Sequence, residues 1–175
     1  LVVERFQPAP SIAGRRHPIT ALVSQGSSTN YWQGIPPWEN YNNLVSAKPE
    51  AITLIEHPKQ KTPSGQSLPL VSVMEAGAGR TMAIASNSLW RWRFHADSSA
   101  SEYDRLYHRF WSNALRWLVK DPEHSRIRLL SKKKTFRSSE NISLEVQVQG
   151  KSYEPIAFAE LDVEILAPDQ SLMAH

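Results

Sequence analysis

Cysteine is absent from all 175 residues of this sequence. Without a thiol, the chain cannot carry a cysteine nucleophile, a disulfide framework or a thiolate metal site. The absence is compatible with both a reducing and an oxidising compartment, so it does not place the protein inside or outside the cell. Thiol catalysis is therefore the first function class that the sequence excludes.

Long apolar runs are also missing. A membrane-spanning helix needs about eighteen or more consecutive apolar residues, and no stretch of the sequence provides them. The N-terminal Leu1–Val3 is followed at once by Glu4 and Arg5, so it lacks the apolar core of a signal peptide and looks like the middle of a strand. We therefore expect a soluble segment with no membrane span.

The excess of positive charge is small. The net charge is +3, and the content of 41% hydrophobic and 21% charged residues is that of an ordinary globular protein. Six cations, including Lys132–Lys134, lie between Arg126 and Arg137 without an acidic residue. A nucleic-acid site would interleave aromatic residues, and only Phe136 is there, so a charged strand edge is the better interpretation and no nucleic acid is expected.

The first 67 residues are rich in Pro, Gly, Ser and Asn. Their apolar pieces predict short strands or single helical turns between long loops: Leu1–Val3, Ile19–Val23 and Ala51–Ile55.

Aromatic residues and a proline pair gather between residues 31 and 41. Neither a helix nor a central strand suits this composition, so we predict an ordered aromatic loop. Such a loop has the composition of a protein interface or a carbohydrate patch. An equal alternative is that the loop packs its own aromatic residues against the sheet. The interface candidates are Tyr31, Trp32, Trp38 and Tyr41.

The middle of the chain has the clearest local pattern. Leu68–Glu75 and Arg80–Ser86 are β-rich runs joined by Gly77–Gly79, which predicts a β-hairpin. Apolar residues then recur at helical spacing from Ser101 to Lys120, and Asp121-Pro122 ends the pattern. A long helix that lies across a sheet is expected there.

From Arg126 onward the apolar period changes to two. Ile127–Leu129, Ile142–Val148 and Leu161–Ile165 alternate as strands with one wet face do. An immunoglobulin-like sandwich needs about seven strands, so these three would form only part of one. We predict two units, residues 1–124 and residues 125–175, and expect that the second cannot close its core alone.

An ordered series of short strings resembles the glutamine-amidotransferase-like family of bacterial membrane-associated proteins. The resemblance covers roughly residues 1 to 125, and its most specific string is Ser86-Asn87-Ser88-Leu89-Trp90-Arg91-Trp92. The other strings are His17-Pro18-Ile19, Leu54-Ile55-Glu56-His57-Pro58, Leu68-Pro69-Leu70, Gly77-Ala78-Gly79-Arg80, Tyr103-Asp104 through Phe110-Trp111, and Arg116-Trp117-Leu118-Val119-Lys120-Asp121-Pro122.

That resemblance implies an α/β fold, namely the later part of a three-layer flavodoxin-like or class I amidotransferase-like domain, followed by a partial antiparallel β-sandwich. It also implies a bacterial, envelope-associated protein with membrane helices outside this segment, and an activity that the family leaves uncharacterised. Class I amidotransferases pair a cysteine with a His-x-Glu motif, and neither is present here. Asn87 occupies the strand end where members tend to carry an acidic residue, and an amide cannot titrate.

The string Trp90-Arg91-Trp92-Arg93 is the strongest candidate for a ligand-binding surface, together with Asn87. In an extended stretch, Trp90 and Trp92 would share one face as a stacking platform, and Arg91 and Arg93 would share the other and could bind a carboxylate or phosphate. The alternative is structural: one or both tryptophans pack on the predicted helix, and Arg91 pairs with a helix carboxylate.

Histidine patterns provide no convincing catalytic or metal site. His95-Ala96-Asp97 offers two ligands without a third, and His17-Pro18 and His57-Pro58 look like strand-edge or loop residues held rigid by proline. No cofactor or metal is therefore expected.

These observations favour a non-catalytic interaction or ligand-binding segment of a larger envelope-associated protein, partnered by a ligand, another protein or the rest of its own polypeptide. One alternative is an enzyme whose nucleophile lies in an N-terminal half outside this sequence. A polyanion-binding module that uses the basic run is the other.

Overall fold

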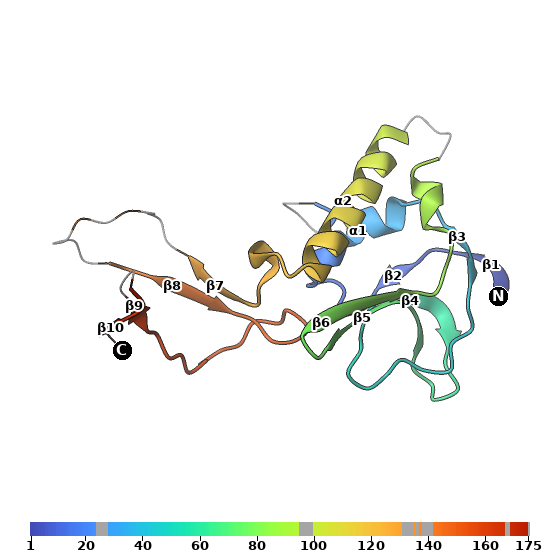
Figure 1. Ribbon diagram of the computed structural model, residues 1–175. Helices are drawn as coiled ribbons and strands as arrows, with labels where there is room; N and C mark the ends of the chain where they lie inside the picture. The colour runs from blue at the N-terminus through green and yellow to red at the C-terminus, as the bar shows by residue number, and fades with distance from the viewer. Residues whose placement is uncertain are drawn as a thin grey trace.

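The computed structural model describes residues 1–23, 28–94, 100–130, 135, 137, 142–166 and 169–174 (Figure 1). Its α-helices are α1 (Ser28–Gly34) and α2 (Ala100–Leu118). Single 3-10 turns form η1 (Pro18–Thr20), η2 (Leu89–Trp92) and η3 (Pro122–His124). The strands are β1 (Val2–Phe6), β2 (Ala9–Pro10), β3 (Trp38–Tyr41), β4 (Ile52–Lys61), β5 (Ser67–Ala76), β6 (Gly79–Ile84), β7 (Ile127–Leu130), β8 (Glu145–Val148), β9 (Ile165–Leu166) and β10 (Leu172–Ala174).

A four-stranded antiparallel sheet in the order β2-β4-β5-β6 organises the first 94 residues. The β5–β6 hairpin keeps an unbroken register from Val71↔Ile84 to Ala76↔Gly79. Its turn contains Gly77 at φ +55, a conformation that glycine adopts without a Cβ clash. The predicted hairpin is thereby confirmed.

Helix α2 lies on one side of this sheet, together with α1 (Figure 1). Leu106, Phe110, Ala114 and Trp117 recur every three or four residues on its buried stripe, so the helix predicted over 101–120 is confirmed with nearly the same bounds. The Phe110 ring packs edge-on against two buried tryptophans, Trp32 and Trp92.

The three-layer flavodoxin-like prediction is wrong. Every strand pair of the described residues is antiparallel, whereas a flavodoxin-like sheet is parallel and carries helices on both faces. The physical reason lies in the connections. Parallel neighbours need a crossover of a dozen or more residues, but β4, β5 and β6 follow one another through short turns. The architecture is mainly β, so the resemblance to an amidotransferase-like domain fails at the level of the fold.

The aromatic stretch is not a loop. Tyr31 and Trp32 belong to α1, and Trp38–Tyr41 is β3, which pairs with β1 in a separate two-stranded sheet. Pro36 and Pro37 stand between these two elements, where they interrupt neither.

The C-terminal residues form an extension that projects from this body (Figure 1). It contains two separate two-stranded antiparallel sheets, β7–β8 and β9–β10. The strand predicted over 127–129 is confirmed as β7, the one over 142–148 is paired only at Glu145–Val148, and the one over 161–165 is coil except at its last residue. None of the helices in the described ranges has the length and apolar character needed to cross a membrane.

Candidate functional site

The predicted Trp-Arg-Trp-Arg site folds differently from the expectation. Residues 89–92 form the 3-10 turn η2 rather than an extended stretch, so Trp90 and Trp92 point in different directions. Trp90 is 53% exposed, whereas Trp92 is fully buried among Trp32, Trp38 and Phe110. The shared indole platform is therefore wrong, because a 3-10 turn does not place alternate residues on one face.

Both arginines of this string have carboxylate partners. An Arg91 guanidinium nitrogen lies 2.7 Å from a carboxylate oxygen of Glu39, and one of Arg93 lies 3.8 Å from Asp104 on α2. Asn87 is exposed and donates its backbone N–H to the side-chain oxygen of Asn40 at 3.2 Å. The arginines therefore fasten η2 to its neighbours, and a ligand-binding role for these residues stays a prediction.

Most of the aromatic interface candidates lie in the core. Trp32, Trp38 and Tyr41 are all buried. The Trp38 ring packs against Phe6 and Trp92, and the Tyr41 ring also packs against Phe6. Tyr31 alone of the four is half-buried, and it lines a surface cavity next to Arg105 of α2. The structure thus favours the alternative in which this stretch packs its own aromatic residues.

His17 and His57 accept the same kind of local hydrogen bond, which the sequence did not predict. In each, Nδ1 accepts the backbone N–H two residues further on, from Ile19 at 3.3 Å and from Lys59 at 3.2 Å. An imidazole that accepts at Nδ1 carries its proton on Nε2 when neutral. Both rings are buried, His17 at the N-terminus of η1 and His57 within β4, so both side chains belong to the interior of the body.

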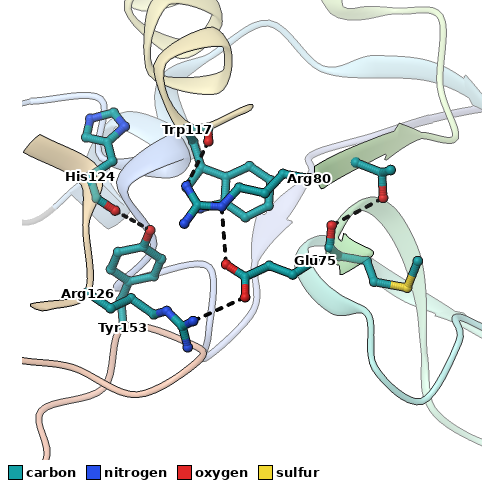
Figure 2. A network of polar contacts seen from close by, with 8 residues as sticks. Glu75, Arg80, Trp117, His124, Arg126 and Tyr153 are labelled. Carbon is teal, nitrogen blue, oxygen red and sulfur yellow. Dashed lines mark hydrogen bonds and ion pairs between the residues drawn. The ribbon is translucent and has the colours of Figure 1, made fainter. Parts of the chain in front are cut away.

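A polar network joins the body to the C-terminal extension (Figure 2). Glu75, near the end of β5, holds Arg80 of β6 at 3.2 Å and Arg126, just before β7, at 3.1 Å. Arg80 also donates to the Trp117 carbonyl at 2.8 Å, and its guanidinium lies 4.7 Å from the centre of the Trp117 ring. One carboxylate therefore ties both units together, and short-range sequence patterns could not predict it because Glu75 and Arg126 are far apart in the chain.

Tyr153 closes the same junction from the other side (Figure 2). Its hydroxyl donates to the His124 carbonyl at 2.7 Å, and its ring lies 4.7 Å from that of His17. Burial, with smaller contributions from His124 and Arg80, lowers the pKa of His17 to about 3. The base of the extension is thus held by a packed aromatic ring as well as by ion pairs.

Beyond this junction, the β7–β8 hairpin exposes an apolar face. The register pairs Ile127 with Val148 and Leu129 with Val146, so these four side chains share one face, called here the arm face. Ile127 is 62% exposed and Leu129 is 61% exposed, while Val146 and Val148 are half-buried.

The opposite face of the same hairpin is largely polar. It carries Arg128, Gln147 and Glu145, with Leu130 as its apolar member. One face therefore has the composition of a surface and the other that of a core, yet two of the four side chains on the core-like face are more than 60% exposed.

Chemistry of other kinds finds little support in the described ranges. They contain no group of three or more His, Asp or Glu side chains placed to hold a metal ion. His95, Asp97 and Lys132–Lys134 lie outside the described residues, so the structure does not address the roles considered for them.

Comparison with protein-family models, with curated proteins and with solved structures finds no match to this chain. The predicted membership of a glutamine-amidotransferase-like family is therefore corrected on two grounds, the absence of any family match and the antiparallel, mainly β architecture.

Proposed function

We propose that this chain is a non-catalytic interaction module that packs its arm face against the β-sheet of a second copy. The observation that carries the proposal is the exposure of Ile127 and Leu129 on a paired hairpin whose other face is largely polar. Alternation of this kind is typical of strands that bury one face. Complete burial of an aliphatic side chain contributes about 1.5–3 kcal/mol relative to leaving it exposed, so packing of this face would be favourable.

A sheet is the occupant that this face fits best. The four residues of the arm face are aliphatic or β-branched and stand in two adjacent rows, as in the inner layer of a sandwich. Ile142 and Leu144 precede β8 and are 55% and 41% exposed, which adds apolar surface next to the hairpin. A partner sheet about 10 Å away would bury these rows together.

Anchoring at the base supports the same function. The ion pairs of Glu75 and the packing of Tyr153 fix the start of the hairpin relative to the body. A surface held in place before association loses less conformational freedom when its partner binds. These contacts therefore hold the arm face in a defined position relative to the body.

Self-association of the isolated chain tests the proposal. A second copy carries the same arm face, so two copies can pack face to face in a two-fold arrangement. We expect sedimentation velocity to show a concentration-dependent dimer that the double variant Ile127→Thr, Leu129→Thr loses. Threonine is itself favoured in strands, so the double variant removes apolar surface without disfavouring the hairpin.

Arg128→Thr is the matched control, because Arg128 lies on β7 between these two residues but faces the other way. It should leave the dimer unchanged. A strictly monomeric wild-type chain, or a dimer that only Arg128→Thr weakens, would contradict the proposal.

A further inference from the structure

A groove lies on the face of the β5–β6 hairpin that α2 does not cover. The hairpin register places Ser72 opposite Ala83 and Met74 opposite Thr81, and these four residues line the floor of the groove. The segment between β3 and β4 passes along this side of the sheet (Figure 1) and supplies the wall, with Leu44 and Ala47 among its residues. The groove has a volume of about 290 Å³.

The lining of the groove is apolar with a few hydroxyl groups. Leucine, valine, methionine, proline and alanine side chains dominate it, and Ser46, Ser72 and Thr81 add hydroxyls. Methionine side chains adapt to the shape of flexible apolar ligands. A narrow aliphatic chain suits such a lining better than a polar or heavily hydrogen-bonding ligand.

One charge distinguishes the groove. Lys48 lines it and is exposed, and no acidic residue of the described part of the chain lines the groove with it. Within those same residues Lys48 forms no ion pair with a carboxylate. An ammonium group beside an apolar groove complements a ligand with an apolar body and an anionic end.

We infer that this groove binds an aliphatic carboxylate, with the chain along the β5–β6 floor and the carboxylate beside Lys48. Ligand pockets for drug-sized molecules span about 300–1,000 Å³, so this groove lies at the small end and suits a single short chain. The inference is independent of the arm face, which lies on a different sheet.

Decanoate, used below its micelle concentration, is the probe. Isothermal titration calorimetry with the full chain should detect one saturable site. Lys48→Met keeps most of the side-chain stem but removes the charge, and it should weaken decanoate binding about twofold to fivefold, as expected for an exposed ion pair. Decanol, which lacks the carboxylate, should bind the wild type and Lys48→Met equally.

Two further variants locate the site. Ala83→Phe fills the floor of the groove and should weaken decanoate binding at least tenfold; Ala83 is exposed, so the bulk can be accommodated without disturbing the core. Ser46→Trp fills the groove from the opposite wall and serves the same purpose if Ala83→Phe does not fold. Lys61→Met, an exposed lysine of β4 that does not line the groove, is the matched charge control and should bind as the wild type does.

Failure of this inference is distinguishable from failure of the proposed function. Binding that is undetectable, or that survives both groove-filling variants, would overturn the groove as a carboxylate site. Binding that the Ile127→Thr, Leu129→Thr variant abolishes would overturn it too, because the ligand would then occupy the arm face. If Lys48→Met weakened the binding of decanoate and of decanol equally, the charge of Lys48 would have no role in recognising the carboxylate.

Discussion

His17 lies between the rings of Trp117 and Tyr153, where burial holds its pKa near 3 against an ordinary value of 6.5. Above pH 6.5 the imidazole is neutral in both the folded and the unfolded chain, so it has no effect on the pH dependence. Between pH 6.5 and pH 3, His17 is protonated in the unfolded chain but stays neutral in the folded chain. Stability therefore falls as the pH falls through this window.

From this shift we expect the free energy of unfolding to drop by about 2 kcal/mol between pH 7 and pH 5 through His17 alone. Urea unfolding followed by tryptophan fluorescence measures it. His17→Asn, which keeps a side-chain acceptor for the Ile19 N–H but does not titrate, should show a flatter pH profile. His108→Gln, at an exposed position of α2, should retain the wild-type slope. Equal slopes in wild type and His17→Asn would refute the assignment.

Trp90 and Trp92 give a second test at this scale. Trp92 is fully buried, so Trp92→Ala should lower the free energy of unfolding by about 3–5 kcal/mol through lost apolar contacts and a cavity. Trp90 is 53% exposed, and Trp90→Ala should change it by less than about 1 kcal/mol. Thermal or urea unfolding of the pair measures both values, and similar losses would show that the orientation of η2 is wrong.

The same two residues show where sequence reasoning reached its limit. Composition alone identified the tryptophans as important, but their faces depend on backbone geometry. An extended backbone puts residues two apart on one face, and a 3-10 turn does not. The four residues of the string do not by themselves determine which conformation forms. In the structure Phe110 and Trp32 pack against the indole of Trp92 and not against that of Trp90.

Among the elements, the β5–β6 hairpin and α2 could be predicted because their signals are local. Alternation, a glycine turn and an apolar stripe at helical spacing each act within one element. Strand direction across the sheet is not local, since β2 joins β4 from more than forty residues away. The resemblance implied a parallel sheet in an α/β fold, and this prediction of strand direction was wrong.

Close packing of the turn after β2 on β4 makes a prediction at the element scale. A Cβ added to Gly14 would overlap sterically with the Leu54 carbonyl oxygen, which is backbone and cannot move aside alone. Gly14→Ala should therefore lower the free energy of unfolding by about 1–3 kcal/mol. Gly34→Ala is the control, because no atom lies within 4 Å of its added Cβ. A wild-type melting temperature for Gly14→Ala would rule out this packing.

At the scale of the whole molecule, the junction decides whether the body and the arm face act as one unit. Tyr153→Ala removes the ring that packs on His17 and the hydroxyl that donates to the His124 carbonyl. Hydrogen exchange in β7 and β8 should then accelerate, while β5 should stay as protected as in the wild type. Tyr153→Phe keeps the ring and should cost only about 1 kcal/mol of local protection. Unchanged exchange in Tyr153→Ala would mean that the ring does not anchor the extension.

This junction could not have been found from the sequence. Glu75, Arg80, Arg126 and Tyr153 carry no shared motif, and the basic residues around 126–137 had suggested a charged strand edge. Arg126 is instead neutralised by Glu75 from β5. Ion pairs between distant segments depend on how the chain folds back on itself, which short-range patterns do not encode.

The arm face is the central claim, and methyl NMR tests it most directly. In a chain labelled at the methyl groups of Ile, Leu and Val, raising the protein concentration should shift the signals of Ile127, Leu129, Val146 and Val148 first, with the body signals unchanged. The same four methyl groups should lose contact with a soluble paramagnetic probe as the dimer forms. Shifts centred on residues of the body, or arm-face methyl groups that stay open to the probe at every concentration, would contradict the account.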